Sequence, residues 1–349
     1  MSRRVNTVMR KLMNVLVVAL VAGPALVLGQ AGDVNKVLAD MRAALGGTDK
    51  LAAVKTLTAV GRTQRTSQNG TTSEAEMELA MELPDKYVAR TVLANMGSMS
   101  VYRNAGFNGN DVINETETPP NLSGGGGMIM VRMADSGALG QAPTPEQKAA
   151  SDLRMIMASK KDFARMTLGM FGSSFDAFPL EFAYAGQAES PDGKAHVITV
   201  TGVDNFSARL FVDAQTNLPL MLSWSDKEPL MMTQTINRGG GPGAAPAGGG
   251  HTVQMGGGSS FTSGAGGKPP TQEEMKKMMA DAEARRKEAE AARKVVEYRI
   301  YYSNFKPVNG VKIPHTLQRS IDGKPTEETT FDQITVNPKI DKQKFAVTK

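Results

Sequence analysis

The sequence contains no cysteine among its 349 residues. This absence excludes disulfide bonds, thiol nucleophiles, and zinc or iron–sulfur sites that cysteine would ligate. It also excludes N-terminal lipidation of the bacterial lipoprotein type, which requires a cysteine at the cleavage site. The fold must therefore be stabilised by its core alone.

Histidine is nearly as scarce. His196, His251 and His315 are far apart in the sequence, none has a second ligand at metal-binding spacing, and neither HExxH nor GxSxG occurs. Without a base near a serine or threonine, a nucleophilic mechanism has no support, so a hydrolase stays only the third alternative. We therefore predict a protein that is not an enzyme, with no catalytic residue, no metal site and no cofactor.

The N-terminal segment has the pattern of an export signal. Four basic residues precede a largely apolar run over residues 12–28, and the small residues Gly29 and Ala31 follow it. This pattern predicts a cleaved signal peptide over residues 1–31 and a periplasmic mature protein. An uncleaved N-terminal anchor is the alternative, since the run is nearly long enough to span a bilayer.

Net charge depends on that signal. The whole chain is +5, but four of its 40 Lys and Arg and none of its 35 Asp and Glu lie in residues 1–31, so the remainder is +1. A nucleic-acid-binding protein is expected to carry a strong basic patch. The sequence therefore predicts no nucleic-acid partner.

An insertion interrupts the predicted domain. Residues 238–270 are Gly, Ala, Ser and Pro without a GK[ST] motif, which predicts a disordered linker rather than a phosphate loop. Residues 271–293 are charged and alanine-rich with i,i+4 ion pairs, which predicts a helix. This helix is either a solvated insertion or a docking arm. Residues 32–237 and 294–349 are then expected to form a single domain.

Few other helices are expected. Apolar residues recur with helical spacing from Asp33 to Leu45, and a short turn follows over residues 48–55. The capping box Thr144-Pro145-Glu146-Gln147 opens a helical segment that runs to about Phe171. The polar run over residues 159–162 predicts that this segment is split in two.

Most of the remaining chain alternates apolar and polar residues with a period of two, which predicts antiparallel strands with one buried face. Four Asn-Gly or Asp-Gly pairs between these runs predict type I′ hairpins. The pairs are Asn69-Gly70, Asp192-Gly193, Asn309-Gly310 and Asp322-Gly323. The fold class is therefore α+β, with one large antiparallel sheet of about ten or eleven strands and helices on one face.

Methionine is abundant, with 22 residues. Its flexible, polarisable side chain suits both irregular core gaps and surfaces that accept varied apolar ligands. Ordinary core packing and an acyl-accepting lining are both consistent with this composition, and thioether copper binding has no dense Met motif to support it.

Three stretches resemble the bacterial outer-membrane lipoprotein carrier superfamily, the LolA/LolB-like proteins. MELAMELPDKYVAR (residues 77–90) is similar to a strand, a proline-bearing turn and a second strand of that family. LFVDAQTNLPLMLSW (residues 210–224) is similar to its paired strands. The stretches YYSNFKPVNGVKIPHTL and FDQITVNPKIDKQKF resemble its terminal strands.

The resemblance implies a curved, incomplete β-barrel whose mouth is covered by helices and whose apolar cavity shields acyl chains. Where the best-known carrier has an arginine beside the proline of the early turn, this chain has Leu83 before Pro84. The expected ligand is a lipid or a lipidated protein, with at most peripheral or transient membrane contact. The residues expected to line the cavity are Met77, Leu79, Met81, Leu218, Leu220, Leu222, Trp224, Tyr298, Ile300 and Tyr302.

A simpler alternative is that these ten residues form the closed core of a sheet packed on helices. A second functional hypothesis is a cell-envelope scaffold that docks a partner protein through the Gly-rich linker and the charged helix.

Overall fold

A computed structural model describes residues 31–67, 70–96, 99–117, 144–190, 193–228 and 287–347, with four single residues between 273 and 284. The predicted signal peptide, the Gly-rich linker and most of the charged helix lie outside the described residues. Among the described residues, no helix is long and apolar enough to span a membrane.

The first two helices follow the sequence pattern. Helix α2 (Ala31–Leu45) begins two residues before Asp33, and its apolar stripe from Val34 to Leu45 is buried as predicted. Gly46 and Gly47 end it with φ of 131° and 99°, a conformation that favours glycine. The turn expected over residues 48–55 contains the short helix α3 (Thr48–Ala52).

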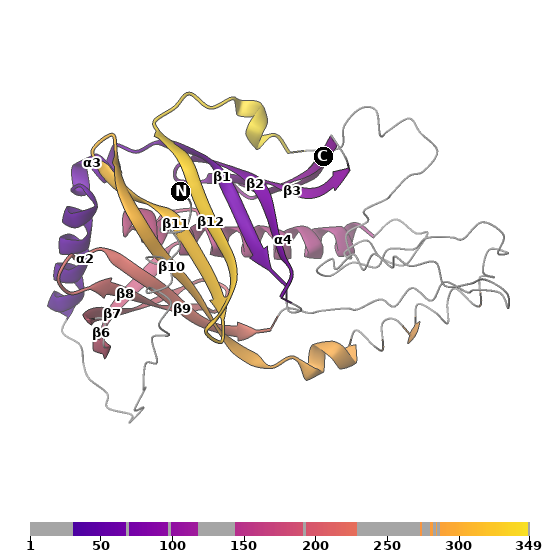
Figure 1. The fold of residues 1–349 in the computed structure, drawn as a ribbon. Coiled ribbons are helices and arrows are strands. Elements are labelled where there is room, and N and C mark those ends of the chain that lie inside the picture. Colours follow the sequence, from indigo (N-terminus) through magenta and orange to yellow (C-terminus); the bar gives the residue numbers. More distant parts are fainter. Residues whose placement is uncertain are drawn as a thin grey trace, which may run out of the picture. The chain divides into compact units, whose positions relative to one another are not determined.

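The strands form one twelve-stranded antiparallel sheet that does not close on itself, which confirms the α+β fold with an incomplete barrel (Figure 1). Its order is β5-β4-β3-β2-β1-β12-β11-β10-β9-β8-β7-β6, so β1 and β12 pair in the middle and β5 and β6 are the edges. The expected count of ten or eleven strands was slightly low. The bounds are β1 (Thr56–Thr66), β2 (Thr72–Glu82), β3 (Lys86–Met96), β4 (Met99–Asn108), β5 (Asp111–Glu117), β6 (Leu180–Ser190), β7 (Gly193–Gly202), β8 (Phe206–Asp213), β9 (Pro219–Lys227), β10 (Val295–Val308), β11 (Val311–Ile321) and β12 (Lys324–Val336).

Two of the predicted hairpins are fully described. Asn309-Gly310 joins β10 to β11 with φ of 48° and 82°, and Asp322-Gly323 joins β11 to β12 with φ of 46° and 74°. Positive φ at both central residues is what a type I′ turn requires, so these two predictions are confirmed. Asn69 and Asp192 lie outside the described residues.

Helix α4 (Pro145–Phe171) corrects one expectation, because it is continuous through residues 159–162. The Thr144 capping box forms as predicted, with Thr144 and Gln147 exchanging side-chain to backbone hydrogen bonds of 3.0 and 3.2 Å. The polar run does not break the helix because Lys160, Lys161 and Asp162 each reach a partner on the sheet or its turns. These partners are Asn110, Asp204 and Arg319, respectively.

The sheet has two different faces. We call the face whose side chains pack against α2 and α4 the inner face. Helix α4 lies along the sheet in Figure 1. One continuous apolar cluster fills this side. It includes Met41 and Leu45 of α2, Phe163, Leu168 and Phe171 of α4, and the strand residues Leu57, Phe107, Leu210, Ile313 and Phe331, all less than 2% exposed.

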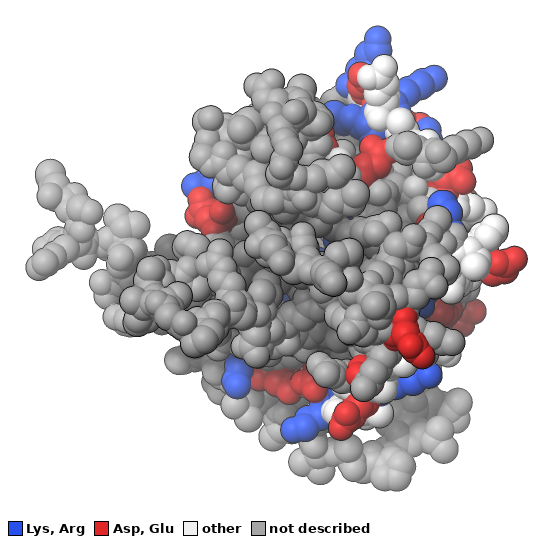
Figure 2. Space-filling model, turned by 90° about the vertical axis from the view of Figure 1, so that its right-hand side faces the viewer, with Lys and Arg blue, Asp and Glu red and all other residues white. Residues whose placement is uncertain are grey.

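The outer face carries two much smaller apolar clusters. In the first, Ala80, Val88 and Ile113 are covered by Phe345 of the 3₁₀ helix η3 (Lys342–Phe345). The second consists of Ala195 and Val197 of β7, Phe211 of β8 and Met221 of β9. The Asp341 side chain caps η3 by accepting a 2.9 Å hydrogen bond from the backbone N–H of Gln343. In the view of Figure 2, acidic and basic side chains of the described residues lie next to one another rather than in areas of one sign.

The chain divides into two compact units. The first includes the described residues up to 117 together with 153–190, 193–225 and 297–347, and the second includes 144–152, 226–228 and 287–296. In the second unit a helical turn over residues 287–292 precedes Arg293. That residues 32–237 and 294–349 form a single domain remains a prediction.

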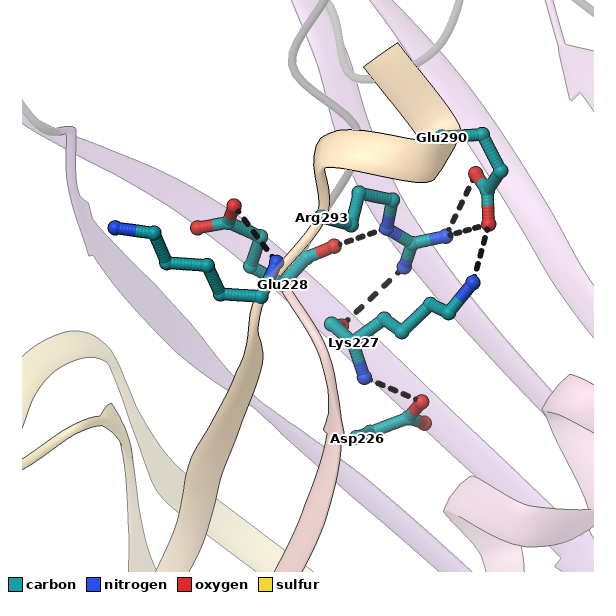
Figure 3. A network of polar contacts seen from close by, with 6 residues as sticks. Asp226, Lys227, Glu228, Glu290 and Arg293 are labelled. Atoms are coloured by element: carbon teal, nitrogen blue, oxygen red, sulfur yellow. Dashed lines mark hydrogen bonds and ion pairs between the residues drawn. The ribbon is translucent and has the colours of Figure 1, made fainter. Parts of the chain in front are cut away.

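Arg293 organises the described part of the second unit (Figure 3). Its guanidinium donates to both carboxylate oxygens of Glu290 at 2.8 and 2.9 Å and to the backbone carbonyls of Glu228 and Lys227 at 2.6 and 3.2 Å. The hydrogen bond from Arg293 lowers the pKa of the Glu290 carboxyl against a small opposing effect of desolvation, and Lys227 adds to the lowering. This network fastens the returning end of the insertion to the end of β9.

Candidate functional site

The structure brings most of the predicted lining residues together on the inner face. Leu79 and Met81 of β2, Leu222 of β9 and Ile300 and Tyr302 of β10 belong to the inner-face cluster and are 0–3% exposed. Met77, Leu218 and Trp224 are partly buried and pack against the same cluster. Tyr298 is partly buried and stacks on Trp224.

Leu220 is the exception. Phe211 pairs with Met221 and Val212 pairs with Pro219, so Leu220 is the extra residue of a β-bulge between β8 and β9. A bulge interrupts the alternation of side chains along the strand. Leu220 is accordingly 39% exposed, and the expectation that it shares the inner face with Leu218 and Leu222 is wrong.

Helix α4 occupies the inner face. Phe163 lies among three aromatic rings, with centroid distances of 5.4 Å to Phe107 in an edge-to-face arrangement, 5.9 Å to Tyr87 and 5.7 Å to Phe175. The buried ones among the predicted lining residues belong to the same apolar cluster as these side chains of α4.

Close approach of α4 to β10 depends on a glycine. A Cβ added at Gly169 would overlap the ring of Tyr302, so only glycine allows the helix to lie this near the strand. The Tyr302 hydroxyl donates a 2.6 Å hydrogen bond to the backbone carbonyl of Arg165. Burial raises the pKa of the Tyr302 hydroxyl, which keeps it protonated as this donor.

An aromatic and cationic stack lies beside this contact. Trp224 and Tyr298 are parallel, with ring centroids 5.4 Å apart and an angle of 11° between their planes. The guanidinium carbon of Arg165 lies 4.1 Å from the centroid of Trp224, within cation–π distance. This stack joins α4 to β9 and β10.

A group of charged residues, which we call the inner charge cluster, lies on the same face. It consists of Arg65 of β1, Glu327 of β12, Arg319 of β11, and Asp162 and Arg165 of α4. The N–O distances are 2.7 Å for Arg65–Glu327, 3.4 Å for Arg319–Glu327, 3.8 Å for Arg319–Asp162 and 3.1 Å for Arg165–Asp162.

The two carboxylates of the inner charge cluster stabilise the charged form of Arg319. Desolvation lowers the pKa of the Arg319 guanidinium, but Asp162 and Glu327 outweigh it, so its pKa is raised. The Arg319 side chain is 32% exposed and that of Asp162 is 47% exposed, so the pair is partly accessible to water.

Sequence reasoning missed this cluster, although a signal for it was present. Arg65 follows Leu57, Ala59 and Thr63 at alternate positions of β1, and Arg319 follows Ile313 and Leu317 in the same way on β11. Because residues at alternate positions of a strand lie on one face of the sheet, these arginines are expected on the same face as the buried residues that precede them.

Two grooves of about 300 Å³ each lie on the outer face. They share Glu78 and Arg90, and their other charged lining residues include Arg62 and Glu117. Arg90 donates to both oxygens of Glu117 at 3.0 and 3.2 Å. Such charged walls do not suit an acyl chain.

The metal-ligating side chains of the described residues are dispersed. These residues hold no group of three or more His, Asp or Glu side chains placed to bind a metal ion. His315 is buried with Nδ1 3.0 Å from the Ile313 carbonyl, and His196 lies 3.2 Å from the Tyr184 hydroxyl.

Comparisons with known proteins found no matching family and no matching curated protein. Among solved structures, the chain is similar to a putative outer membrane lipoprotein-sorting protein domain from Vibrio parahaemolyticus, with 8% identity and a TM-score of 0.38, over 90% of this chain and 96% of that one. It is also similar to a DUF1329 family protein from Desulfovibrio piger, with 7% identity and a TM-score of 0.41. A LolA superfamily protein from Nitrosomonas europaea gives 6% identity and a TM-score of 0.41. These last two comparisons cover 90% of this chain and 97% of the other.

Likenesses this remote carry no argument about ligands or partners. The structures that this chain resembles do include a lipoprotein-sorting domain and a LolA superfamily protein, the superfamily that its sequence resembles.

Proposed function

We propose that this protein is an exported, non-enzymatic carrier that binds a lipid or the acyl chains of a lipoprotein on the inner face of its sheet, after α4 has moved away from it. Its expected location is the periplasm, on the evidence of the signal-peptide pattern in residues 1–31. The observation that supports the proposal is the way α4 covers an apolar face of a sheet that is not closed.

The energetics allow such an exchange. The six large apolar side chains of α4 that are buried (Ile156, Phe163, Met166, Leu168, Met170 and Phe171) contribute about 1.5–3 kcal/mol each, or on the order of 13 kcal/mol together. An acyl chain of about 16 carbons gains on the order of 12 kcal/mol on burial at about 0.8 kcal/mol per CH₂. The two gains are of similar size, so a ligand with one or more acyl chains can compete with the helix for the inner face. Binding remains reversible, because the helix competes for the same surface.

Polar contacts of α4 would limit its movement without locking it. Lys161 Nζ lies 2.6 Å from the Asp204 carboxylate, and Lys160 Nζ donates to Asn110 at 3.1 Å. The partly exposed Lys161–Asp204 ion pair contributes about 0–1 kcal/mol. The hydrogen bond from buried Lys160 to the neutral Asn110 amide contributes about 1.5–3 kcal/mol. Both contacts orient the helix on the sheet.

The test is to tether α4 and measure lipid uptake. Because the chain has no cysteine, Lys160→Cys with Asn110→Cys introduces the only two thiols, which a short bismaleimide joins across their present contact. Native mass spectrometry of the mature protein should show phospholipid or acylated peptide before cross-linking. Uptake should be lost afterwards.

The two single-cysteine variants, treated with the same reagent, are the controls and should bind as the unmodified protein does. Unchanged uptake by the cross-linked protein would show that α4 does not gate the inner face. A clean apo mass with no uptake of added lipid would favour the packed-core alternative.

One observation favours the scaffold hypothesis as a second candidate. Arg293 joins residues 227–228 to the helical turn at residues 287–292, so the two ends of the insertion are held together (Figure 3). An insertion anchored in this way can present the charged segment over residues 271–293 to a partner protein. Deletion of residues 239–286 leaves this network intact and should abolish partner capture while lipid uptake persists.

A further inference from the structure

In the inner charge cluster, the guanidinium of Arg319 makes only long contacts with its carboxylate partners. The nearest carboxylate oxygens to Arg319 are 3.4 Å away on Glu327 and 3.8 Å away on Asp162. A charge-assisted hydrogen bond is about 2.7–2.9 Å long, and a guanidinium offers five N–H donors. Within the described part of the chain, Arg319 therefore has unused capacity for an oxyanion.

The two acidic partners of Arg319 differ in what else they bind. Glu327 is engaged at 2.7 Å by Arg65 from the neighbouring strand β1, so its charge is already compensated on the sheet. Asp162 is on α4 and is engaged at 3.1 Å by Arg165, three residues further along the same helix.

This arrangement has a consequence when α4 moves. Asp162 and its partner Arg165 move together with the helix, so this acid of the inner charge cluster stays paired. Arg319 stays on β11 beside a Glu327 that Arg65 already neutralises. Removing the helix therefore exposes one uncompensated positive charge at the border of the apolar inner face. An anion brought by the ligand would restore the pairing.

We propose that Arg319 is the headgroup subsite of the carrier, and that the ligand is an acyl amphiphile with an oxyanion head, a carboxylate or a phosphate, which takes the place that the Asp162 carboxylate holds now. This inference rests on the proposed function, since it assigns the head of the ligand whose tail replaces α4. Asp162 then acts as an internal competitor of the ligand head. The apolar tail lies toward Ile313 and Leu317, which precede Arg319 on the inner side of β11.

The experiment compares two ligands that differ only at the head. Oleate and oleyl alcohol have the same chain, and their affinities for the full mature protein are measured by titration below the critical concentration of each. We expect about tenfold tighter binding of oleate, the effect of one hydrogen bond to a charged group. In Arg319→Gln the two affinities should become equal, with oleyl alcohol unchanged.

Three further variants separate the headgroup effect from general loosening of α4. Arg319→Lys keeps the charge and should retain part of the preference for oleate. Asp162→Asn removes the competitor and should strengthen oleate binding several-fold without weakening the preference. Arg62→Gln is the matched control, because it removes one arginine with exposed ion pairs on the outer face and should leave both affinities unchanged.

A second ligand pair, dioleoyl phosphatidic acid and dioleoylglycerol, differs only by the phosphate and distinguishes a phosphate head from a carboxylate, since discrimination in either pair supports the subsite. Equal affinities of the unmodified protein for anionic and uncharged heads would overturn the assignment while leaving the carrier function intact. An oleate preference that survives Arg319→Gln in a protein with unchanged thermal unfolding would also overturn it. If no acyl ligand binds at all, the carrier function itself fails and the assignment fails with it.

Discussion

The inner and outer faces of the sheet show how the same alternating strands can carry two kinds of surface. On the inner face, Leu79 and Met81 of β2 pack under α4 and are 1% and 0% exposed. On the outer face of the same strand, Glu78 pairs with Lys344, and Arg62 of β1 pairs with Glu74 and Asp332.

The difference between the faces shows where a ligand could be accommodated. The inner surface is apolar, continuous and covered by a helix that approaches it from far away in the sequence. The outer surface carries ion pairs and two small apolar clusters, one of which is covered by the C-terminal segment. Within the described residues, the inner surface has the larger continuous apolar area, and a helix covers it.

Truncating one phenylalanine on each face should give the largest contrast. Phe163→Ala removes a ring from the aromatic centre of the inner-face cluster and should lower the free energy of unfolding by about 3–5 kcal/mol, because a cavity remains. Phe345→Ala on the outer face should cost about 1.5–3 kcal/mol, since water replaces the ring. Urea unfolding midpoints measure both, and equal losses would contradict the contrast.

The close contact between α4 and β10 should give the next largest effect. Gly169→Ala places a methyl group into the Tyr302 ring and should destabilise the protein by about 1–3 kcal/mol through overpacking. In a Tyr302→Leu background the same substitution should cost much less. A double-mutant cycle measures this coupling, and additive effects would show that the two residues are not in contact.

Breaking one outer-face ion pair should have a small effect. Glu117→Gln removes the charge that Arg90 contacts through two hydrogen bonds and leaves the stacking of Arg90 on Tyr102 in place; the Glu117 side chain is 53% exposed. The loss should be about 0.2–1 kcal/mol, and high salt should reduce it further. Thermal unfolding at low and high ionic strength tests this, and a loss as large as that of Phe163→Ala would contradict the proposed difference between the faces.

The smallest effect is expected in the second unit and depends on pH. The pKa of Glu290 is lowered by Arg293, so its contribution to the network is complete above the ordinary glutamate pKa and is lost as pH falls through the lowered value. Amide hydrogen exchange of residues 287–292, corrected for intrinsic rates, should therefore accelerate in acid. Glu290→Gln should remove this pH dependence, and identical profiles would contradict the role of the carboxylate.

Local sequence patterns predicted the elements of the fold well where local physics decides. The buried stripe of α2, the Thr144 capping box and the I′ turns at Asn309-Gly310 and Asp322-Gly323 all follow from short-range rules. The alternation in β2 and β10 correctly placed Leu79, Met81, Ile300 and Tyr302 on a single buried face.

Other features depend on residues that are distant in the sequence. The polar run at 159–162 looked like a helix break, yet its side chains are satisfied by residues of other elements, and the helix continues. Leu220 matched the alternation of β9, but the pairing with β8 turned it outward through a bulge. No pattern within a single strand contains that information.

For the candidate site, the sequence by itself determined which strand residues are apolar, the absence of thiol chemistry, and the glycine that α4 needs at position 169. Only the tertiary structure decided that α4 fills the inner face and that Asp162 meets Arg319, residues 157 positions apart in the chain. The physical reason is that burial patterns show how much apolar surface must be covered. Which distant element covers it depends on the shape and charge of both partners.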